Sequence, residues 1–198
     1  MSRLIETIRL EKGQFGNLSY HQARMDLAFR ELFQDRSPID LKEFLSTCPV
    51  PSIGLHKIRM VYDSEIQSVQ ISVYNARKIQ RLKIVESNSI LYPHKFEDRM
   101  VLESLFALRG DCDDIIIAKN GAITDASLAN VAFKRDGKWF TPKTCLLRGT
   151  MRQQLLDKKI IFEEEITIDD LQRYEKVRLI NAMVQFEGPE IDVSQIVR

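Results

Sequence analysis

Four short segments, far apart along the chain, carry the residues that could do chemistry: 20–25, 93–99, 123–133 and 146–154. The polar candidates within them are Arg24, Lys95, Arg99, Asp125 and the Gly149-Thr150 pair. A Gly-Thr pair that opens a helix offers backbone N–H groups, a hydroxyl group and the positive end of the helix dipole to an anion such as phosphate. Each candidate alone also fits a structural role, such as a surface lysine or a turn aspartate. The four segments therefore have to be interpreted as a set.

Several common chemistries find no support in the sequence. It contains no GxGxxG, no GxxxxGK[ST], no GxSxG and no HExxH. The three histidines are not spaced as a helical ligand pair, and the three cysteines form neither a CxxC motif nor a cluster with histidine. We therefore expect no metal site and no thiol nucleophile.

Taken in order, the four segments resemble the class IV aminotransferase family. These fold-type IV pyridoxal phosphate enzymes include branched-chain and D-amino acid aminotransferases and aminodeoxychorismate lyase. The resemblance starts at Glu6-Thr7-Ile8 and ends at Ile180-Asn181-Ala182-Met183. Its most specific stretch is 124–152, where the family pattern is an acidic residue, small residues, Asn, an apolar pair, Thr-Pro and Leu-x-Gly-[IT]-x-Arg. The matching residues here are Asp125, Asn130, Thr141-Pro142 and Leu147-Arg148-Gly149-Thr150-Met151-Arg152.

The resemblance implies pyridoxal phosphate as the cofactor and gives each candidate a role. Lys95 is the expected Schiff-base lysine, which must also move a proton and therefore needs a lowered pKa. A carboxylate must keep the pyridine nitrogen protonated, and Asp125 stands at that position although larger members usually carry Glu. The expected phosphate ligands are Arg24, Gly149 and Thr150.

Ser127, Ala129 and Asn130 are expected to shape the loop under the cofactor ring, although Asn130 also fits a turn or a strand end. Arg99 is the expected substrate-binding residue, because it follows Lys95 by one turn if that segment is helical.

The spacing Lys95-x-x-x-Arg99 and the run 149–153 are most similar to aminodeoxychorismate lyase, which eliminates pyruvate to give 4-aminobenzoate. Asp98 stands where that lyase has Asn. The segment that precedes the Glu-Thr-Ile strand in the family has no counterpart here, so we expect an N-terminally shortened member. An aminotransferase of the branched-chain or D-amino acid type, and a non-catalytic protein that binds pyridoxal phosphate, remain open alternatives.

The first half of the chain predicts an antiparallel sheet that carries a helix. Strands are expected at 4–10, 55–62 and 69–74. A helix is expected from Ser19, as its N-cap, to about residue 33. Its apolar stripe, expected to face the sheet, consists of Ala23, Leu27, Ala28, Phe29 and Leu32. A shorter helix is expected from Ser37-Pro38 to residue 44.

The second half alternates strands with short helices. Helices are expected at 99–108, from Gly149-Thr150 onward and at 168–174, with strands at 115–118, 130–133, 138–140 and 177–181. Asn120-Gly121 and Asp136-Gly137 predict tight hairpin turns. The basic stretch 75–89 is expected to be a solvated strand face, with an anion site as the alternative.

These elements predict an α+β protein with the two-lobed, D-amino acid aminotransferase-like architecture of fold type IV and pyridoxal phosphate at the lobe junction. A small α+β lobe, 1–88, would hold the antiparallel sheet and the phosphate-side Arg24. A larger α/β lobe, 89–198, would hold Lys95 and the phosphate-binding residues.

The composition is that of an ordinary globular chain of 198 residues, 44% hydrophobic and 29% charged. A net charge of +1 supplies no field that would attract nucleic acid or an acidic membrane. No apolar run approaches the length of a membrane span, and the odd, scattered cysteines fit a reducing compartment. We expect a cytoplasmic enzyme that acts on a small-molecule amino substrate and, as in the family, a homodimer.

Overall fold

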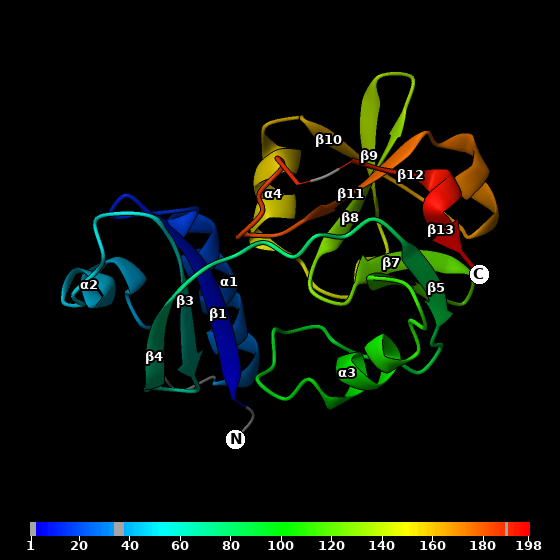
Figure 1. Ribbon diagram of the computed structural model, residues 1–198. Helices are drawn as coiled ribbons and strands as arrows, with labels where there is room; N and C mark the ends of the chain where they lie inside the picture. Colours follow the sequence, from blue (N-terminus) through cyan, green and yellow to red (C-terminus); the bar gives the residue numbers. More distant parts are fainter. Residues whose placement is uncertain (1–2, 34–37, 189) are drawn as a thin grey trace. The chain divides into compact units, whose positions relative to one another are not determined.

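The chain forms two compact α+β units, seen here in a computed structural model that describes residues 3–33, 38–188 and 190–198 (Figure 1). One unit comprises Met1–Ala76 and His94–Asp98, and the other comprises Arg77–Pro93 and Arg99–Arg198. The α+β class predicted from the sequence is confirmed. Among the described residues, none of the helices combines the length and the apolar character that a membrane crossing requires.

The first unit is an antiparallel sheet in the order β2-β1-β3-β4 with one long helix on it. Its strands are β1 (Leu4–Glu11), β2 (Gln14–Phe15), β3 (Leu55–Tyr62) and β4 (Ile66–Val73). Figure 1 shows α1 (Leu18–Leu32) lying along β1, and a short α2 (Leu41–Ser46) follows it. Alternate β1 residues face this helix, and the core of the unit contains Leu4, Ile8, Leu10, Met25, Phe29, Ile58 and Met60.

The buried face of α1 differs from the predicted stripe. His21, Met25, Ala28 and Phe29 are buried, whereas Ala23 and Leu32 are exposed. The stripe was misplaced because it counted only apolar residues, while the helix turns His21 toward the sheet.

The predicted starts of both helices in this unit also differ from the structure. α1 is capped by Asn17 in a left-handed conformation (φ 53°) and not by Ser19. α2 is capped by Asp40, whose side chain accepts a hydrogen bond from Glu43 N at 2.9 Å. The predicted start at Ser37 lies outside the described residues, and Pro38 precedes the helix.

A segment from the middle of the chain completes the edge of β1. Phe96 pairs with Leu4 in antiparallel fashion. Ile5 N donates to Lys95 O at 2.9 Å, and Glu97 N donates to Arg3 O at 2.9 Å. Residues 94–98 therefore belong to the first unit, and Lys95 with them.

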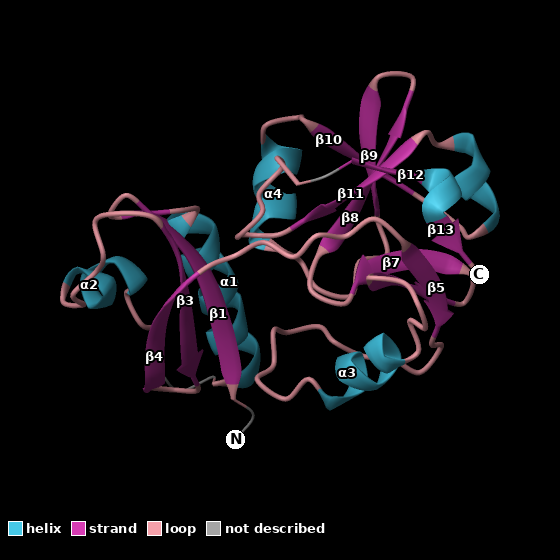
Figure 2. Cartoon of the chain, viewed as in Figure 1, coloured by secondary structure: helices cyan, strands magenta, loops and turns pink. Residues whose placement is uncertain are grey.

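The second unit is built on one mixed sheet in the order β10-β9-β8-β7-β6-β5-β13, with β11 pairing β8 and β12 (Figure 2). Its strands are β5 (Leu82–Glu86), β6 (Asp114–Lys119), β7 (Ala122–Ala126), β8 (Asn130–Arg135), β9 (Lys138–Pro142), β10 (Ile161–Glu164), β11 (Lys176–Ile180), β12 (Glu190–Asp192) and β13 (Ile196–Val197). Its helices are α3 (Met100–Ala107) and α4 (Thr150–Asp157), together with the 3₁₀ helices η1 (Asp169–Arg173) and η2 (Val193–Gln195).

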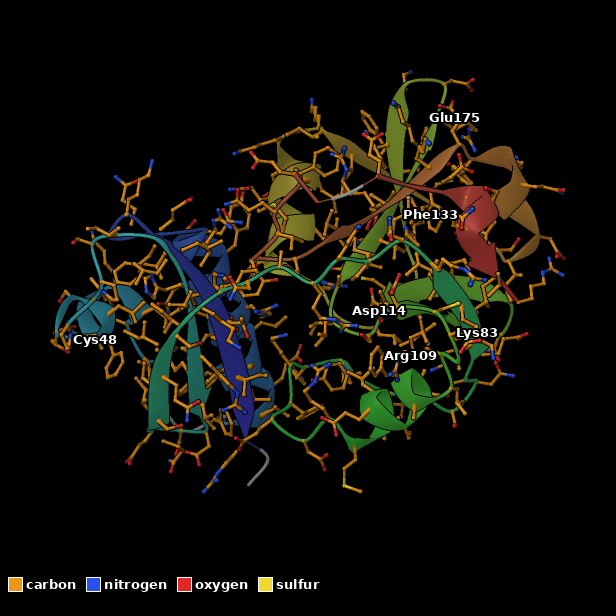
Figure 3. The ribbon with its side chains drawn as sticks, in the orientation of Figure 1. Cys48, Lys83, Arg109, Asp114, Phe133 and Glu175 are labelled. Atoms are coloured by element: carbon orange, nitrogen blue, oxygen red, sulfur yellow. The ribbon has the colours of Figure 1, made fainter. Side chains whose placement is uncertain are left out.

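Several local predictions for this unit are confirmed, whereas only Leu82–Glu86 of the basic stretch 75–89 forms a strand. Asn120-Gly121 and Asp136-Gly137 adopt positive φ at both residues of each pair, as two-residue hairpin turns require. The helix predicted from Gly149-Thr150 begins at Thr150. Phe133, labelled in Figure 3, is fully buried in the core of the sheet. The short strands β12 and β13 were not predicted.

The division of the chain differs from the predicted lobes 1–88 and 89–198. The units part after Ala76, because β5 pairs with β6 and β13 in parallel and so belongs to the second unit. Lys95 was predicted in the larger lobe, but its segment pairs with β1 of the first unit.

Candidate functional site

Lys95 is half-buried on a backbone segment that the first unit holds at several points. Its carbonyl oxygen accepts a hydrogen bond from β1, as described above. On one side, His94 Nε2 lies 3.0 Å from Glu31 Oε2 of α1. On the other side, Arg59 Nη2 of β3 donates to Glu97 Oε1 at 3.1 Å. These contacts fix the position from which the Lys95 side chain extends.

Arg24 lies in the same unit and is paired with a buried carboxylate. Its Nε donates to Glu6 Oε1 at 2.9 Å and its Nη2 donates to Glu6 Oε2 at 2.5 Å. Glu6 is fully buried on β1, where His21 Nδ1 lies 2.5 Å from Glu6 Oε2. We call Glu6, His21 and Arg24 the Glu6 cluster.

The charges of the Glu6 cluster are set by burial and pairing. Burial alone would raise the pKa of Glu6, but Arg24 and His21, which both hydrogen-bond to its carboxylate, bring it down to about 2. Burial lowers the pKa of His21, against the opposite influence of Glu6. At neutral pH the cluster therefore holds a carboxylate, a guanidinium and a neutral imidazole.

Glu6 and His21 were not predicted as site residues. The signal was a charged residue at an inward position of an otherwise apolar strand, because Glu6 alternates with Leu4 and Ile8. A carboxylate at such a position requires a cationic partner, and Arg24 supplies it from the helix that covers the strand.

Asp125 is the central carboxylate of the second unit. It is only 5% exposed at the end of β7. Its Oδ1 accepts from Asn130 Nδ2 at 2.6 Å, and its Oδ2 accepts from the backbone N of Leu146 at 2.8 Å and of Leu147 at 3.0 Å. Burial raises the pKa of Asp125 to about 6, although these hydrogen bonds act in the opposite direction.

Asn130 links Asp125 to the start of α4. Its Nδ2 also donates to Leu147 O at 2.8 Å. Its Oδ1 lies so close to Gly149 that a Cβ added there would be 2.0 Å away. Gly149 is the N-cap of α4, and its φ of −69° suits any residue. The close approach of Asn130, and not the backbone conformation, therefore requires glycine at this position. Asp125 and the helix N-terminus thus form one connected arrangement.

Ser127 and Arg99 form a second connection in the same unit. Arg99 Nη2 donates to Ser127 O at 2.8 Å, and the Arg99 guanidinium lies 6.0 Å from the centre of the Tyr92 ring. The Ser127 hydroxyl is buried and has no hydrogen-bond partner among the described residues. The premise that Arg99 lies one helical turn beyond Lys95 is wrong, because α3 begins at Met100 and leaves Lys95 outside it.

Two sets of the predicted residues are thus brought together, one within each unit. Arg24 and Lys95 belong to the first unit, and the charge of Lys95 acts on His21 of the Glu6 cluster. The second unit contains Arg99, Asp125, Ser127, Asn130, Gly149 and Thr150.

The second set fits the donor and acceptor groups of pyridoxal phosphate. Each carboxylate oxygen can accept two hydrogen bonds, so three donors leave Asp125 Oδ1 one acceptor position for a protonated pyridine nitrogen. The positive charge of a protonated pyridine nitrogen would also lower the pKa of Asp125, against the effect of burial. The Ser127 hydroxyl has an unused donor, and the N-terminus of α4 suits a phosphate. Among the residues described, no His, Cys, Asp and Glu cluster could hold a metal ion.

Comparisons with known proteins agree with this chemistry. The family model described as amino-transferase class IV matches residues 58–186. An uncharacterized protein of Haemophilus influenzae is 34% identical over 186 residues, which cover 92% of this chain and 98% of that protein.

Two solved structures share the fold over nearly the whole chain. One, from Haemophilus somnus and provisionally named 4-amino-4-deoxychorismate lyase, has a TM-score of 0.87 and 35% identity, covering 92% of this chain and 97% of its own. The other, from Mesorhizobium loti and provisionally named amino-acid aminotransferase, has a TM-score of 0.80 and 24% identity, covering 97% and 98%.

Proposed function

The chain belongs to the class IV aminotransferase family, whose cofactor is pyridoxal phosphate, and on that premise we propose that it eliminates pyruvate from 4-amino-4-deoxychorismate. The second product is 4-aminobenzoate. The observation that carries the cofactor assignment is the buried Asp125 carboxylate, which keeps one acceptor position and is tied through Asn130 to the N-terminus of α4. The choice of reaction rests on the Haemophilus somnus relative and on the run Gly149-Thr150-Met151-Arg152-Gln153.

Each predicted residue has a binding role in this proposal. The candidate phosphate ligands are the Arg24 guanidinium, which Glu6 holds by two hydrogen bonds in the first unit, and the N–H groups at Gly149 and Thr150 in the second unit. Asp125 Oδ1, which keeps one acceptor position, would accept a hydrogen bond from the protonated pyridine nitrogen. The Ser127 hydroxyl and Asn130 define the loop beside the ring.

When bound, pyridoxal phosphate supplies an electron-withdrawing ring that stabilises negative charge on the substrate carbon next to the amine. Asp125 supports that role by holding a proton at the ring nitrogen. Lys95 Nζ, in its neutral form, accepts the proton from the amine-bearing carbon of the substrate. It then returns a proton to the methylene carbon of the enolpyruvyl group while the ether C–O bond to the ring breaks. The electron pair left on the amine-bearing carbon forms a ring double bond as pyruvate leaves.

Arg99 has a binding role and a structural contact in this scheme. The substrate carries two carboxylates, and a guanidinium is suited to bind one of them. The same guanidinium donates to Ser127 O. If Arg99 binds substrate, Arg99→Ala lowers pyruvate release more than it lowers cofactor affinity; equal losses would restrict its role to holding the Ser127 loop.

The alternative reaction is amino-group transfer, which the name of the family and the Mesorhizobium loti structure both keep open. The two reactions differ in what they require. A lyase releases pyruvate without a keto-acid acceptor, whereas an aminotransferase exchanges amino groups between an amino acid and 2-oxoglutarate.

The test is a pair of assays on protein loaded with pyridoxal phosphate. We expect pyruvate from 4-amino-4-deoxychorismate without an acceptor, and no pyruvate from Lys95→Ala. Lys57→Ala is the matched control, because Lys57 is a half-buried lysine on β3 of the same unit. Amino exchange without pyruvate would replace the lyase with the aminotransferase. Silence in both assays with cofactor bound would favour a non-catalytic binding protein.

The family resemblance also leads us to propose a homodimer. Light scattering behind a sizing column should then give twice the chain mass of 23.0 kDa. A mass of one chain, at the concentration used for the assays, would contradict the proposal.

A further inference from the structure

The Glu6 cluster holds Arg24 in one orientation. Glu6 bonds to Nε and Nη2 of the guanidinium, so the plane of that group is fixed by two hydrogen bonds to one carboxylate. The Arg24 side chain retains 14% exposure, whereas the side chains of Glu6 and His21 are fully buried. Only the arginine can therefore reach a ligand from outside the core.

His21 is held in one tautomer by the same carboxylate. An ionised carboxylate only accepts hydrogen bonds, so Nδ1, at 2.5 Å from Glu6 Oε2, must carry the proton. Nε2 is buried and has no partner among the described residues. A second proton there would be unpaired and close to the positive charges of Arg24 and Lys95. His21 is thus a neutral donor that fixes the second oxygen of Glu6.

We propose that Glu6 and His21 are positioning residues, which hold the Arg24 guanidinium in the orientation that binds the phosphate of the cofactor. The inference rests on the proposed function, since it takes Arg24 as a phosphate ligand. Glu6 acts on Arg24 directly, and His21 acts through Glu6. Neither residue touches the cofactor in this account.

The sign of one substitution separates positioning from simple electrostatics. Glu6 is a negative charge next to a proposed phosphate site, so Coulomb's law alone predicts tighter phosphate binding when the charge is removed. Positioning predicts the opposite, because Glu6→Gln cannot accept both N–H groups of Arg24 and still accept from His21. The direction of the change in affinity therefore decides between the two.

The experiment measures the dissociation constants of pyridoxal phosphate and of pyridoxal, which lacks the phosphate. For Glu6→Gln we expect the pyridoxal phosphate constant to rise about tenfold, the loss of one well-placed charged hydrogen bond, while the pyridoxal constant stays unchanged. Glu11→Gln is the matched control, since Glu11 is an exposed glutamate on β1 that pairs with Arg9 at 3.0 Å. It should leave both constants unchanged.

Substitutions at Arg24 and at His21 test the order in which the cluster acts. Arg24→Lys keeps the charge but lacks the planar fork, so Glu6→Gln should have no further effect on phosphate affinity in that background. His21→Asn, which retains a donor in place of Nδ1, should preserve more affinity than His21→Leu. If Glu6 and His21 only stabilised the fold, Glu6→Gln would still weaken phosphate binding in the Arg24→Lys background. His21→Asn would then bind no more tightly than His21→Leu.

Nuclear magnetic resonance of the His21 ring nitrogens in the cofactor-free wild type provides a readout that needs no variant to fold. We expect a neutral ring protonated at Nδ1 at pH 7. An imidazolium ion, or a proton at Nε2, would overturn the inference. So would a Glu6→Gln protein that binds pyridoxal phosphate as tightly as wild type or more tightly. A wild type that binds no pyridoxal phosphate would instead contradict the proposed function itself.

Discussion

Gly149→Ala probes the link between Asp125 and α4. The added Cβ would lie 2.0 Å from Asn130 Oδ1, against an ordinary contact of 3.4 Å or more, so the amide must move by about 1.4 Å. That movement breaks the two hydrogen bonds of Asn130 Nδ2, to Asp125 at 2.6 Å and to Leu147 O at 2.8 Å. The backbone of Gly149 itself presents no strain to alanine.

The magnitude follows from those two bonds. A hydrogen bond to a charged group contributes about 1.5–3 kcal/mol and a neutral one about 1 kcal/mol. Alanine offsets about 0.4–1 kcal/mol of this loss by restricting the unfolded chain. We expect Gly149→Ala to lower the free energy of unfolding by about 1.5–3.5 kcal/mol.

The assay is denaturant unfolding of four proteins: wild type, Gly149→Ala, Asn130→Ala and the double variant. Asn130→Ala removes the group that the new Cβ would strike, so Gly149→Ala should have almost no further effect in that background. Additive effects of the two substitutions, or a neutral Gly149→Ala, would contradict the close approach of Asn130 to Gly149.

Two other substitutions and one titration test the remaining site residues. Arg24→Ala should weaken pyridoxal phosphate binding by about 1.5–3 kcal/mol in equilibrium dialysis, and unchanged binding would make Arg24 a purely structural partner of Glu6. Lys95→Ala should still bind the cofactor, but without a covalent bond. In the cofactor-free protein, the Asp125 carboxyl resonance should titrate near pH 6, and bound cofactor should move that midpoint lower. Because the pKa of Asp125 in the folded protein exceeds the ordinary 3.8, its protonated form stabilises the folded protein below pH 3.8. This contribution to the free energy of unfolding, about 3 kcal/mol, is lost as the pH rises through 6. A midpoint near 4 would contradict that burial.

Local features of this fold could be predicted because their physical causes lie within a few residues. The Asn120-Gly121 and Asp136-Gly137 turns need residues that tolerate positive φ, and the sequence offers them between apolar strands. The start of α4 follows equally from the Gly149-Thr150 pair.

Features that depend on distant partners could not be predicted in the same way. Glu6 is stable in a core only because His21 and Arg24 reach it from a helix, and the pattern of β1 shows the need for a cationic partner but not which residue supplies it. The same holds for Lys95, whose segment joins the edge of β1 and leaves the unit that the chain order suggested. The tie from Asn130 to Gly149 likewise links β8 to α4 across an intervening hairpin strand.

The role of Lys95 is the central claim, and reductive labelling tests it most directly. Purified protein incubated with pyridoxal phosphate should show a visible absorption band that borohydride abolishes. Peptide mass spectrometry should then find the reduced cofactor on Lys95, with Lys57 unlabelled as the comparison within the same unit. No label, or a label carried mainly by another lysine, would contradict the account.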